Sequence, residues 1–173
     1  MTTNHLHIIG IDPGGTTGYA RFTIPRASMF GREPSRWLGQ DYGEFTGPEP
    51  LQAIEIARYI RATQSLDFRT GPAVVIEDWT IDPTFKSTDP ESLSPVRIGA
   101  MLALLKHQNL LGDATLTFQN RALAFSTVTD DRLRRWCLWT PGSDHIRAAT
   151  RHAVTALRRA RADSVLASAM WPR

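Results

Sequence analysis

Two short apolar segments of this chain each end on an acidic residue. The segment LHIIGID (residues 6–12) runs into a Pro-Gly-Gly turn, and the segment AVVIE (residues 73–77) follows a Gly-Pro pair. Short apolar runs bounded by turn residues are typical of strands buried in a sheet. Because acids are poor strand residues and costly to bury, Asp12 and Glu77 need a specific explanation.

Two explanations for Asp12 and Glu77 stay open at this point. Each acid either lies just past its strand in solvent and starts a turn, or the two strands lie side by side and the acids form a metal site. Paired carboxylates supply the hard oxygen ligands that Mg²⁺ prefers, and two such strand ends favour the metal site. Asp78 is expected to point to the other side of its strand, because side chains alternate along a strand.

The other segments alternate between strand and helix patterns. Strands are predicted at residues 18–24, 37–45 and 115–119, and loops at residues 25–36 and 81–92. Helices are predicted from Pro48 and Pro50 onwards and at residues 94–108, 129–138 and 144–162. The order β-β-β-α-β-α-β-α-α predicts an α/β protein with a mixed sheet.

Two of these helices have an expected apolar face. In the helix that opens at Pro48, apolar residues recur every three positions, at Leu51, Ile54, Ala57 and Ile60. In the helix at residues 94–108, the expected apolar face consists of Ile98, Met101, Leu104 and Leu105.

The composition is that of one globular domain. The chain has 173 residues, of which 42% are apolar and 21% charged. The longest apolar run, residues 98–105, is far shorter than the roughly 20 residues that span a bilayer. Residues 1–7 lack the basic and apolar parts of a secretory signal, and the single cysteine, Cys137, cannot form an internal disulfide. We therefore expect one soluble domain, residues 1–173, in a reducing compartment such as the cytoplasm, without a membrane partner.

The positive charge is almost entirely arginine. Lysine and arginine number 20 against 17 acids, only Lys86 and Lys106 are lysines, and the net charge is +3. A genome biased towards arginine codons explains this as well as phosphate contact does. Many arginines crowd the C-terminal third, where Asp163 is the only acid between residues 146 and 173. That distribution indicates an anionic partner.

A glycine-rich turn, DPGGTTG (residues 12–18), separates the first two predicted strands. It lacks the spacing of a Walker loop and the helix of a dinucleotide-binding fold. Its backbone N–H groups could wrap a phosphate, but a tight hairpin with positive φ at glycine is the simpler explanation.

The segment 144–162 has the clearest helical pattern in the chain, with Ser143 or Asp144 as its N-cap. Its core stripe consists of Ile146, Ala149, Ala153, Leu157 and Ala160. At 100° per residue a second stripe holds His145, Ala148 and His152, and a third holds Arg147, Arg151 and Arg158. The second stripe could close a metal site, although two ordinary half-exposed histidines are the simpler explanation of an isolated pair.

Three motifs follow one another along the chain: IIGIDPGGTTGYA, VVIED and DHIRAATRHAV. In this order and spacing they resemble the RuvC-type resolvases of the ribonuclease H-like superfamily. The stretch FQNRALAFSTVTDDRLRRW, followed by HIRAATRHA, is similar to the RuvC-like proteins of actinobacterial phages. The resemblance spans about residues 6–160. It implies a ribonuclease H-like α/β fold with a five-stranded mixed sheet flanked by helices, a homodimer, and Mg²⁺-dependent cutting of four-way (Holliday) DNA junctions during recombination and repair.

The resemblance also implies a centre of two Mg²⁺ ions, for which Mn²⁺ would substitute. Asp12 would bridge the ions, Glu77 and position 148 would each bind one, and His145 would ligate a metal or assist proton transfer. Where the family has an aspartate, this chain has Ala148. The alanine is either a natural degeneration or an introduced inactivating substitution, and the intact surroundings favour the second. The resemblance therefore implies an endonuclease whose activity is impaired.

DNA contacts are implied as well. Around Ala124 and Phe125 the family pattern has a lysine, which Arg121 would replace. Trp79 or Phe85 could stack on a base at the opened crossover, although packing within its own protomer explains Phe85 nearly as well. The helix at residues 94–108 is the candidate dimer helix. The expected DNA-binding residues are Phe85, Lys86, Arg121, Arg132, Arg135, Arg147 and Arg151.

Two other functions compete with the endonuclease. The glycine-rich turn also resembles the first phosphate loop of small-molecule kinases and ATPases of the same superfamily. Those proteins enclose a nucleotide between two such domains and this chain supplies one, so no nucleotide cofactor is expected. The second alternative is a protein that binds branched DNA without cutting it, and Ala148 makes that alternative serious.

Overall fold

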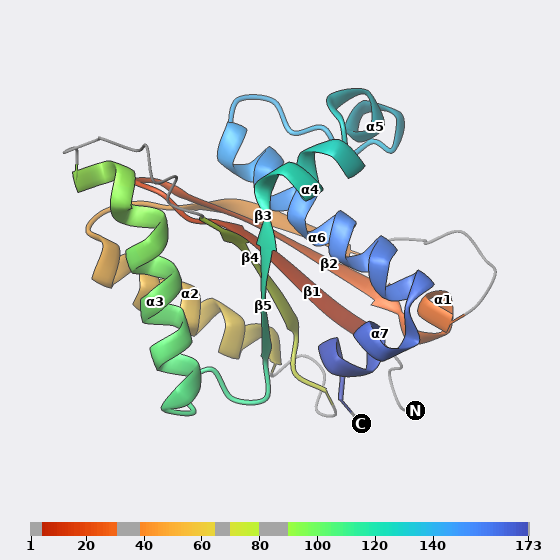
Figure 1. Cartoon of the computed structure of the whole chain (residues 1–173), viewed down its shortest axis with the longest axis horizontal. Helices are drawn as coiled ribbons and strands as arrows, with labels where there is room; N and C mark the ends of the chain where they lie inside the picture. Colours follow the sequence, from red (N-terminus) through yellow and green to blue (C-terminus); the bar gives the residue numbers. More distant parts are fainter. Residues whose placement is uncertain (1–4, 31–38, 65–69, 80–89, 173) are drawn as a thin grey trace.

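A five-stranded sheet forms the centre of the molecule (Figure 1). The computed structural model describes residues 5–30, 39–64, 70–79 and 90–172. The strand order is β3-β2-β1-β4-β5. The strands are β1 (His5–Asp12), β2 (Thr17–Pro25), β3 (Gly39–Phe45), β4 (Ala73–Asp78) and β5 (Thr115–Asn120).

The sheet is mixed, as the sequence predicts. β1 pairs with β2 as an antiparallel hairpin, and β2 pairs in the same way with β3. On its other side β1 runs parallel to β4, and β4 runs parallel to β5. The turn at residues 12–18 is therefore a hairpin. Its glycines do not have the expected positive φ, which among the described glycines occurs only at Gly47, Gly112 and Gly142.

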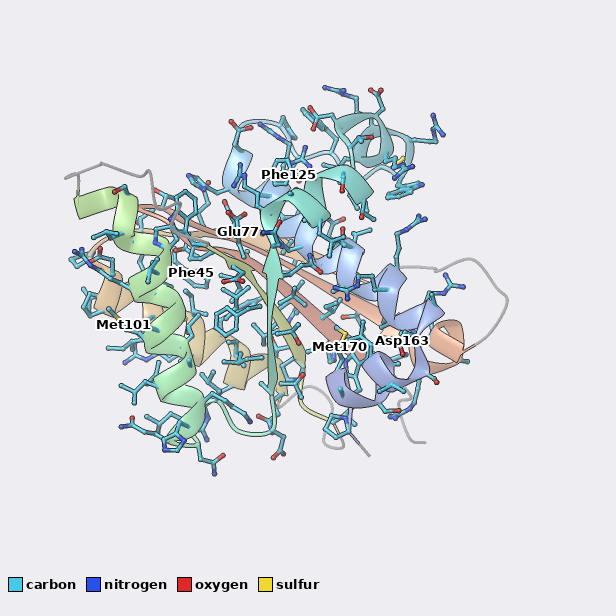
Figure 2. All side chains as sticks on the ribbon, in the orientation of Figure 1. Phe45, Glu77, Met101, Phe125, Asp163 and Met170 are labelled. Carbon is cyan, nitrogen blue, oxygen red and sulfur yellow. The ribbon has the colours of Figure 1, made fainter. Side chains whose placement is uncertain are left out.

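Helices cover both faces of the sheet, and two apolar cores separate the layers. One core lies under α2 (Glu49–Gln64) and α3 (Ser94–His107), and the other lies under α6 (Asp144–Ala162), α7 (Ser164–Met170) and α1 (Arg26–Phe30). Figure 2 shows Phe45 and Met101 on the side of α2 and α3, and Met170 on the side of α6 and α7.

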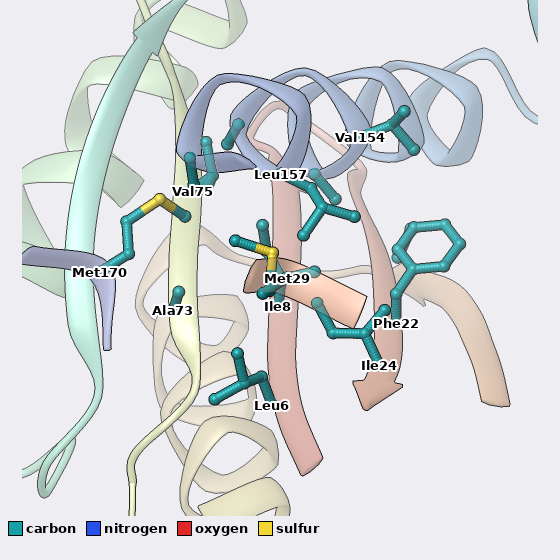
Figure 3. Packing of buried hydrophobic residues seen from close by; sticks show 14 of the residues in the cluster. Leu6, Ile8, Phe22, Ile24, Met29, Ala73, Val75, Val154, Leu157 and Met170 are labelled. Atoms are coloured by element: carbon teal, nitrogen blue, oxygen red, sulfur yellow. The ribbon is translucent and has the colours of Figure 1, made fainter. Parts of the chain in front are cut away.

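Side-chain alternation along the central strands decides what faces α6. In β1, Leu6 and Ile8 belong to the core under α6 (Figure 3). Ile9 and Ile11 belong to the core under α2 and α3. In β4, Ala73 and Val75 face α6, and Val74 and Ile76 face the other way. Continuing this period of two places Asp12 and Glu77 on the α6 face of the sheet.

Two glycines let α6 approach the sheet at backbone distance. A Cβ atom on Gly10 would lie 2.0 Å from the carbonyl oxygen of Ala149, and one on Gly18 would lie 2.3 Å from the carbonyl carbon of His145. The predicted core stripe of this helix is confirmed, since all five of its residues are buried. The side chain of Ser143 accepts a hydrogen bond from the N–H of Ile146, so Ser143 is the N-cap.

The apolar faces expected for α2 and α3 are partly wrong. In α2, Ala57 and Ile60 are buried, but Leu51 and Ile54 are exposed. A spacing of three residues drifts around a helix of 3.6 residues per turn, so four such positions cannot share one face. In α3 the buried apolar side chains include Ile98 and Leu102, whereas Leu104 is exposed and Met101 and Leu105 are half-buried.

Three short helices were not expected from the sequence. α1 begins inside the predicted loop at residues 25–36, α4 (Arg121–Thr127) follows β5 directly, and α7 follows α6. Asn120 and Asp163 cap α4 and α7 with their side chains. The helix predicted at residues 129–138 is the shorter α5 (Asp130–Arg135), capped by Thr129. A 3-10 turn, η1 (Pro90–Leu93), precedes α3.

No helix among the described residues combines the length and apolar character that crossing a membrane requires. The expected strand at residues 37–45 is observed from Gly39 onwards, and residues 37–38 lie outside the described residues.

The packing of α6 on the sheet predicts that Gly10 cannot be replaced by a larger residue without loss of stability. The substitution Gly10→Ala places a methyl group inside the backbone of α6. We expect the free energy of unfolding to fall by about 3 kcal/mol, because overpacking of this kind cannot be relieved by a side-chain rotation. Urea unfolding followed by circular dichroism measures the loss. Gly15→Ala is the matched control, because a Cβ atom there meets nothing within 4 Å. Equal stability of the two variants would contradict the close packing of α6.

Candidate functional site at the ends of β1 and β4

Asp12 and Glu77 form a buried pair of carboxylates at one end of the sheet. β1 and β4 are parallel neighbours with Ile11 opposite Ile76, so the acid that follows each of these residues lies at the same edge. Asp12 is 5% exposed and Glu77 is 4% exposed. The explanation of the two acids as solvent-facing turn residues is therefore wrong. Asp78 is exposed, as its place in the strand predicts.

α6 supplies one histidine to each carboxylate. His145 Nδ1 lies 2.8 Å from Asp12 Oδ2, and His152 Nε2 lies 3.0 Å from Glu77 Oε2. His145 is half-exposed, but His152 is completely buried, which the interpretation as ordinary half-exposed residues did not foresee. Ala148 is buried on the same face of α6, between the two histidines. A side chain at position 148 therefore faces the carboxylate pair.

A cation of the protein itself contacts both acids. Arg121 Nη1 lies 3.1 Å from each carboxylate oxygen of Glu77 and 3.8 Å from Asp12 Oδ1. Arg121 is the first residue of α4, which Asn120 caps, so the end of β5 positions the guanidinium group. This group also stacks on the ring of Phe125, 4.4 Å from the ring centroid. Arg121, expected as a DNA contact, is therefore placed at the carboxylates.

The pKa values of the acids shift in opposite directions. Burial raises the pKa of Asp12, against the hydrogen bond with His145, and the charge of Glu77 adds to the rise. Burial also acts to raise the pKa of Glu77, but hydrogen bonds with His152 and Asp12 and the charge of Arg121 outweigh it and lower that pKa. The hydrogen bond with Asp12 raises the pKa of His145. Asp12 therefore holds a proton more readily than Glu77 does.

The donor set falls short of a two-ion metal centre. Asp12 and Glu77 offer the oxygen ligands that Mg²⁺ prefers, but Ala148 offers only a methyl group. Within the described ranges, no group of three or more His, Cys, Asp or Glu side chains could hold a metal ion. The residues present therefore do not fit the centre of two Mg²⁺ ions that the resemblance implies.

Two hollows meet at Arg121 and Phe125, next to the acids. The first, of about 440 Å³, reaches Glu77 and is lined by Glu77, Asp78, Trp79, Asn120, Arg121, Ala122 and Phe125. The second, of about 320 Å³, is lined by Arg121, Phe125, Asp130, Trp139, Asp144, Arg147 and Arg151. Figure 2 labels Glu77 and Phe125, which line the first hollow, at the end of the sheet where β5 leads into α4.

Some of the arginines expected to bind DNA are exposed, and others are buried. Arg132 and Arg135 are exposed on α5. Arg151 is 6% exposed; its guanidinium group donates to the carbonyl oxygen of Val128 and pairs with Asp130. Its charge is therefore already compensated inside the protein.

Arg147 is also largely internal. It donates to the carbonyl oxygen of Thr140 and pairs with Asp144. Phe85 and Lys86, the other residues expected to contact DNA, lie outside the described residues.

Arginine side chains stack on two tryptophan rings, of which Trp139 lines the second hollow. The ring of Trp139 has Arg134 at 4.0 Å and Arg147 at 4.6 Å, and Trp136 has Arg158 at 5.4 Å. In the sequence these tryptophans are only neighbours of arginines. The fold brings Arg147 and Arg158 of α6 onto their rings. Of these arginines, Arg134 and Arg158 are exposed, whereas Arg147 is largely internal and paired with Asp144. The exposed guanidinium groups, held on aromatic rings, suit contact with a nucleic-acid backbone.

Solved structures with this arrangement of elements exist. A structure described as T. thermophilus RuvC in complex with Holliday junction substrate superposes with a TM-score of 0.61 and 14% identity, over 92% of this chain and 97% of that chain. The structure of Thermus thermophilus RuvC gives a TM-score of 0.61 and 16% identity, over 91% and 96% of the two chains. The chain has a RuvC-like fold. No protein-family model and no curated protein sequence matches it.

The RuvC-like fold confirms the predicted ribonuclease H-like architecture. At 14–16% identity, the similarity establishes a shared fold but does not establish a shared reaction. The roles of the individual site residues therefore depend on the geometry of this chain alone. The sequence pattern placed His152 on the helix stripe that could close a metal site, although not among the expected site residues. It missed Gln119 of β5, whose Nε2 atom lies 3.1 Å from His152 Nδ1, because nothing in the strand pattern singles this residue out.

The contact of His145 with Asp12 predicts a pH-dependent part of the stability. A histidine whose folded pKa is raised stabilises the fold fully below its unfolded pKa of about 6.5, and this contribution is lost as the pH rises through the folded pKa. His145→Gln should therefore destabilise the metal-free protein more at pH 6 than at pH 9, as urea unfolding measures. The control His107→Gln changes an exposed histidine of α3 and should show a smaller difference between the two pH values than His145→Gln does. An effect of His145→Gln that grows with pH would refute the assignment.

Proposed function

We propose that this chain is a RuvC-like protein that selects branched DNA, above all the four-way junction, and whose phosphodiester hydrolysis is impaired by Ala148. The observation that carries the proposal is the buried pair of Asp12 and Glu77, tied to His145 and His152 in a RuvC-like fold. One of the solved RuvC structures with this fold holds a Holliday junction substrate. The exposed arginines Arg134 and Arg158, stacked on tryptophan rings, support DNA as the partner.

The site residues have distinct roles in this proposal. Asp12 and Glu77 would be two of the carboxylates of an Mg²⁺-dependent nuclease site, for which Mn²⁺ would substitute, once a third acid completed the site. His145 would ligate a metal or assist proton transfer beside Asp12. An aspartate at position 148 would add the third carboxylate, which the present donor set lacks. Without a bound metal ion, Arg121 balances the negative charges of the two acids. It contacts DNA when the DNA backbone enters the hollow that Arg121 and Phe125 line.

A protein that binds branched DNA without cutting it is the second candidate. The observation that favours it is the contact of Arg121 with both acids, because the guanidinium group takes the place that a cation would need. Both candidates share the DNA-binding surface and differ only in what position 148 would restore. Action in the cytoplasm and kinship with phage proteins stay predictions from the sequence.

α3 is the proposed dimer helix. It exposes Val96 and Leu104, and Phe118 of β5, which is 46% exposed, lies against Gly99 of the same helix. A two-fold dimer would present two sites to a substrate with two-fold symmetry.

Leu104→Glu should convert the dimer into a monomer of 19.3 kDa in sedimentation at micromolar concentration, because it places a charge in the apolar contact. Leu51→Glu is the matched control, since Leu51 on α2 is equally exposed at 55%. A wild-type protein that sediments as a monomer would remove the dimer from the proposal.

Junction binding should exceed duplex binding and weaken steeply with salt. If phosphate neutralisation drives binding, the logarithm of the affinity falls linearly with the logarithm of salt, with a slope of ~0.9 per phosphate contacted. Fluorescence anisotropy with a labelled four-way junction and a duplex of the same sequence, both in EDTA, measures the two affinities. Removal of the exposed charges by Arg132→Gln with Arg135→Gln should lower the slope. Equal affinity for the two DNAs would refute selection of branched DNA.

Ala148→Asp should raise Mg²⁺-dependent nicking of a labelled four-way junction by ~100-fold or more, since each ~1.4 kcal/mol of transition-state stabilisation is worth a factor of ten. The wild-type chain should cut very poorly while it binds the junction. Ala148→Asn is the matched control, because it has the same size without the charge. Ala148→Asp combined with Asp12→Asn should abolish the gain.

Two results of this experiment would overturn the proposal. Rapid cutting by the wild-type chain would show that Ala148 does not impair the site. A folded Ala148→Asp variant, verified by circular dichroism, that binds junctions and does not cut them would leave the non-catalytic candidate.

A further inference from the structure

His152 is a completely buried histidine with a hydrogen-bond partner on each ring nitrogen. Nε2 lies 3.0 Å from Glu77 Oε2, and Nδ1 lies 3.1 Å from Gln119 Nε2. Glu77 and Gln119 are only 4% and 3% exposed. They are directly opposite one another in the register of β4 and β5, so His152 reaches from α6 onto two adjacent strands.

The partners of Gln119 determine which nitrogen of His152 carries the proton. The Nε2 atom of Gln119 also lies 3.3 Å from the main-chain carbonyl oxygen of His152. A carbonyl oxygen only accepts hydrogen bonds, so the amide end that faces His152 is the NH₂ group, which only donates. Gln119 therefore donates to Nδ1 as well, and a ring nitrogen that accepts carries no hydrogen. The remaining ring proton is on Nε2, where it points at Glu77.

This arrangement fixes the orientation of the Glu77 carboxylate through the buried side chain of His152. Glu77 Oε2 accepts from the Nε2–H group of His152, while both oxygens face Arg121 at 3.1 Å. A neutral donor takes up one lone pair and sets the rotation of the carboxylate without cancelling its charge. The opposite tautomer would aim a lone pair at a carboxylate oxygen and leave the amide of Gln119 facing an N–H group.

We propose that His152 is a positioning residue for Glu77, held by Gln119 in the neutral form that carries its proton on Nε2. His152 thereby differs from His145, which contacts Asp12 and is half-exposed. The tautomer and the hydrogen bond do not depend on what the protein does, whereas their importance for cutting rests on the proposed function.

Nuclear magnetic resonance of the full chain labelled with ¹⁵N-histidine tests the assignment without DNA or metal. The wild-type spectrum should show His152 with an unprotonated Nδ1 and a slowly exchanging proton on Nε2. Glu77→Gln should shift this proton, because the charged acceptor is replaced by a neutral one. Gln119→Met, which removes the donor to Nδ1, should shift the Nδ1 signal, while the contact with Glu77 keeps the proton on Nε2. Thr155→Val, another buried polar change on α6, is the control and should leave the His152 signals in place.

A proton on Nδ1 of His152 in the wild-type chain, or no response to Glu77→Gln, would overturn the proposal. These results stand whether or not the chain cuts DNA, so they separate this proposal from the proposed function.

The consequence for cutting is measured in the Ala148→Asp background. His152→Met keeps the apolar volume and removes the donor, and should lower nicking by ~10–100-fold, the usual effect of losing a partner behind a functional carboxylate. His152→Gln places an amide donor near the same point and should restore most of the rate, while junction affinity stays unchanged in both. Equal loss in both variants would indicate a purely structural histidine and would refute the positioning role.

Discussion

The contact between the backbone of α6 and the backbones of β1 and β2 is the constraint on which the rest of the structure depends. Gly10 and Gly18 have no Cβ atom, and any larger residue at either position would collide with main-chain atoms of Ala149 or His145. Because the helix lies at this distance, the side chains at its sheet-facing edge reach the strands directly. A helix held further away by even one methyl group would separate His145 from Asp12.

The same contact explains why two buried acids are tolerated. Each carboxylate would be costly to bury alone, but Asp12 has His145 and Glu77 has His152, and Arg121 reaches both acids from the start of α4. The two acids, two histidines and one arginine come from four separate elements. In the stripe of His145, Ala148 and His152, position 148 alone offers no polar group, and among the described residues the site therefore lacks a third acid or other metal ligand there.

The elements that the sequence predicted well are those with one unambiguous pattern. The buried strands 6–12 and 73–77 and the amphipathic helix 144–162 are found within one or two residues of their predicted bounds. The prediction failed at Leu51 and Ile54, where a spacing of three residues does not match the helical repeat of 3.6 residues. It also failed for α4 and α7, which are short helices that depend on a capping side chain and on packing against a neighbour. A helix of seven residues is too short to have a periodicity of its own, so tertiary packing decides whether it forms.

The sequence by itself determined that Asp12 and Glu77 end two buried strands, that His145, Ala148 and His152 share one helical face, and that most of the positive charge is arginine. These properties follow from local periodicity and side-chain chemistry, which need no knowledge of neighbours. Only the tertiary structure decided that Arg121 contacts the acids, that Arg151 is buried against Asp130, and that His152 joins Glu77 to Gln119. Those pairings join residues 21 to 109 positions apart. They are brought together by the register of β4 with β5 and by the close packing of α6 on Gly10 and Gly18.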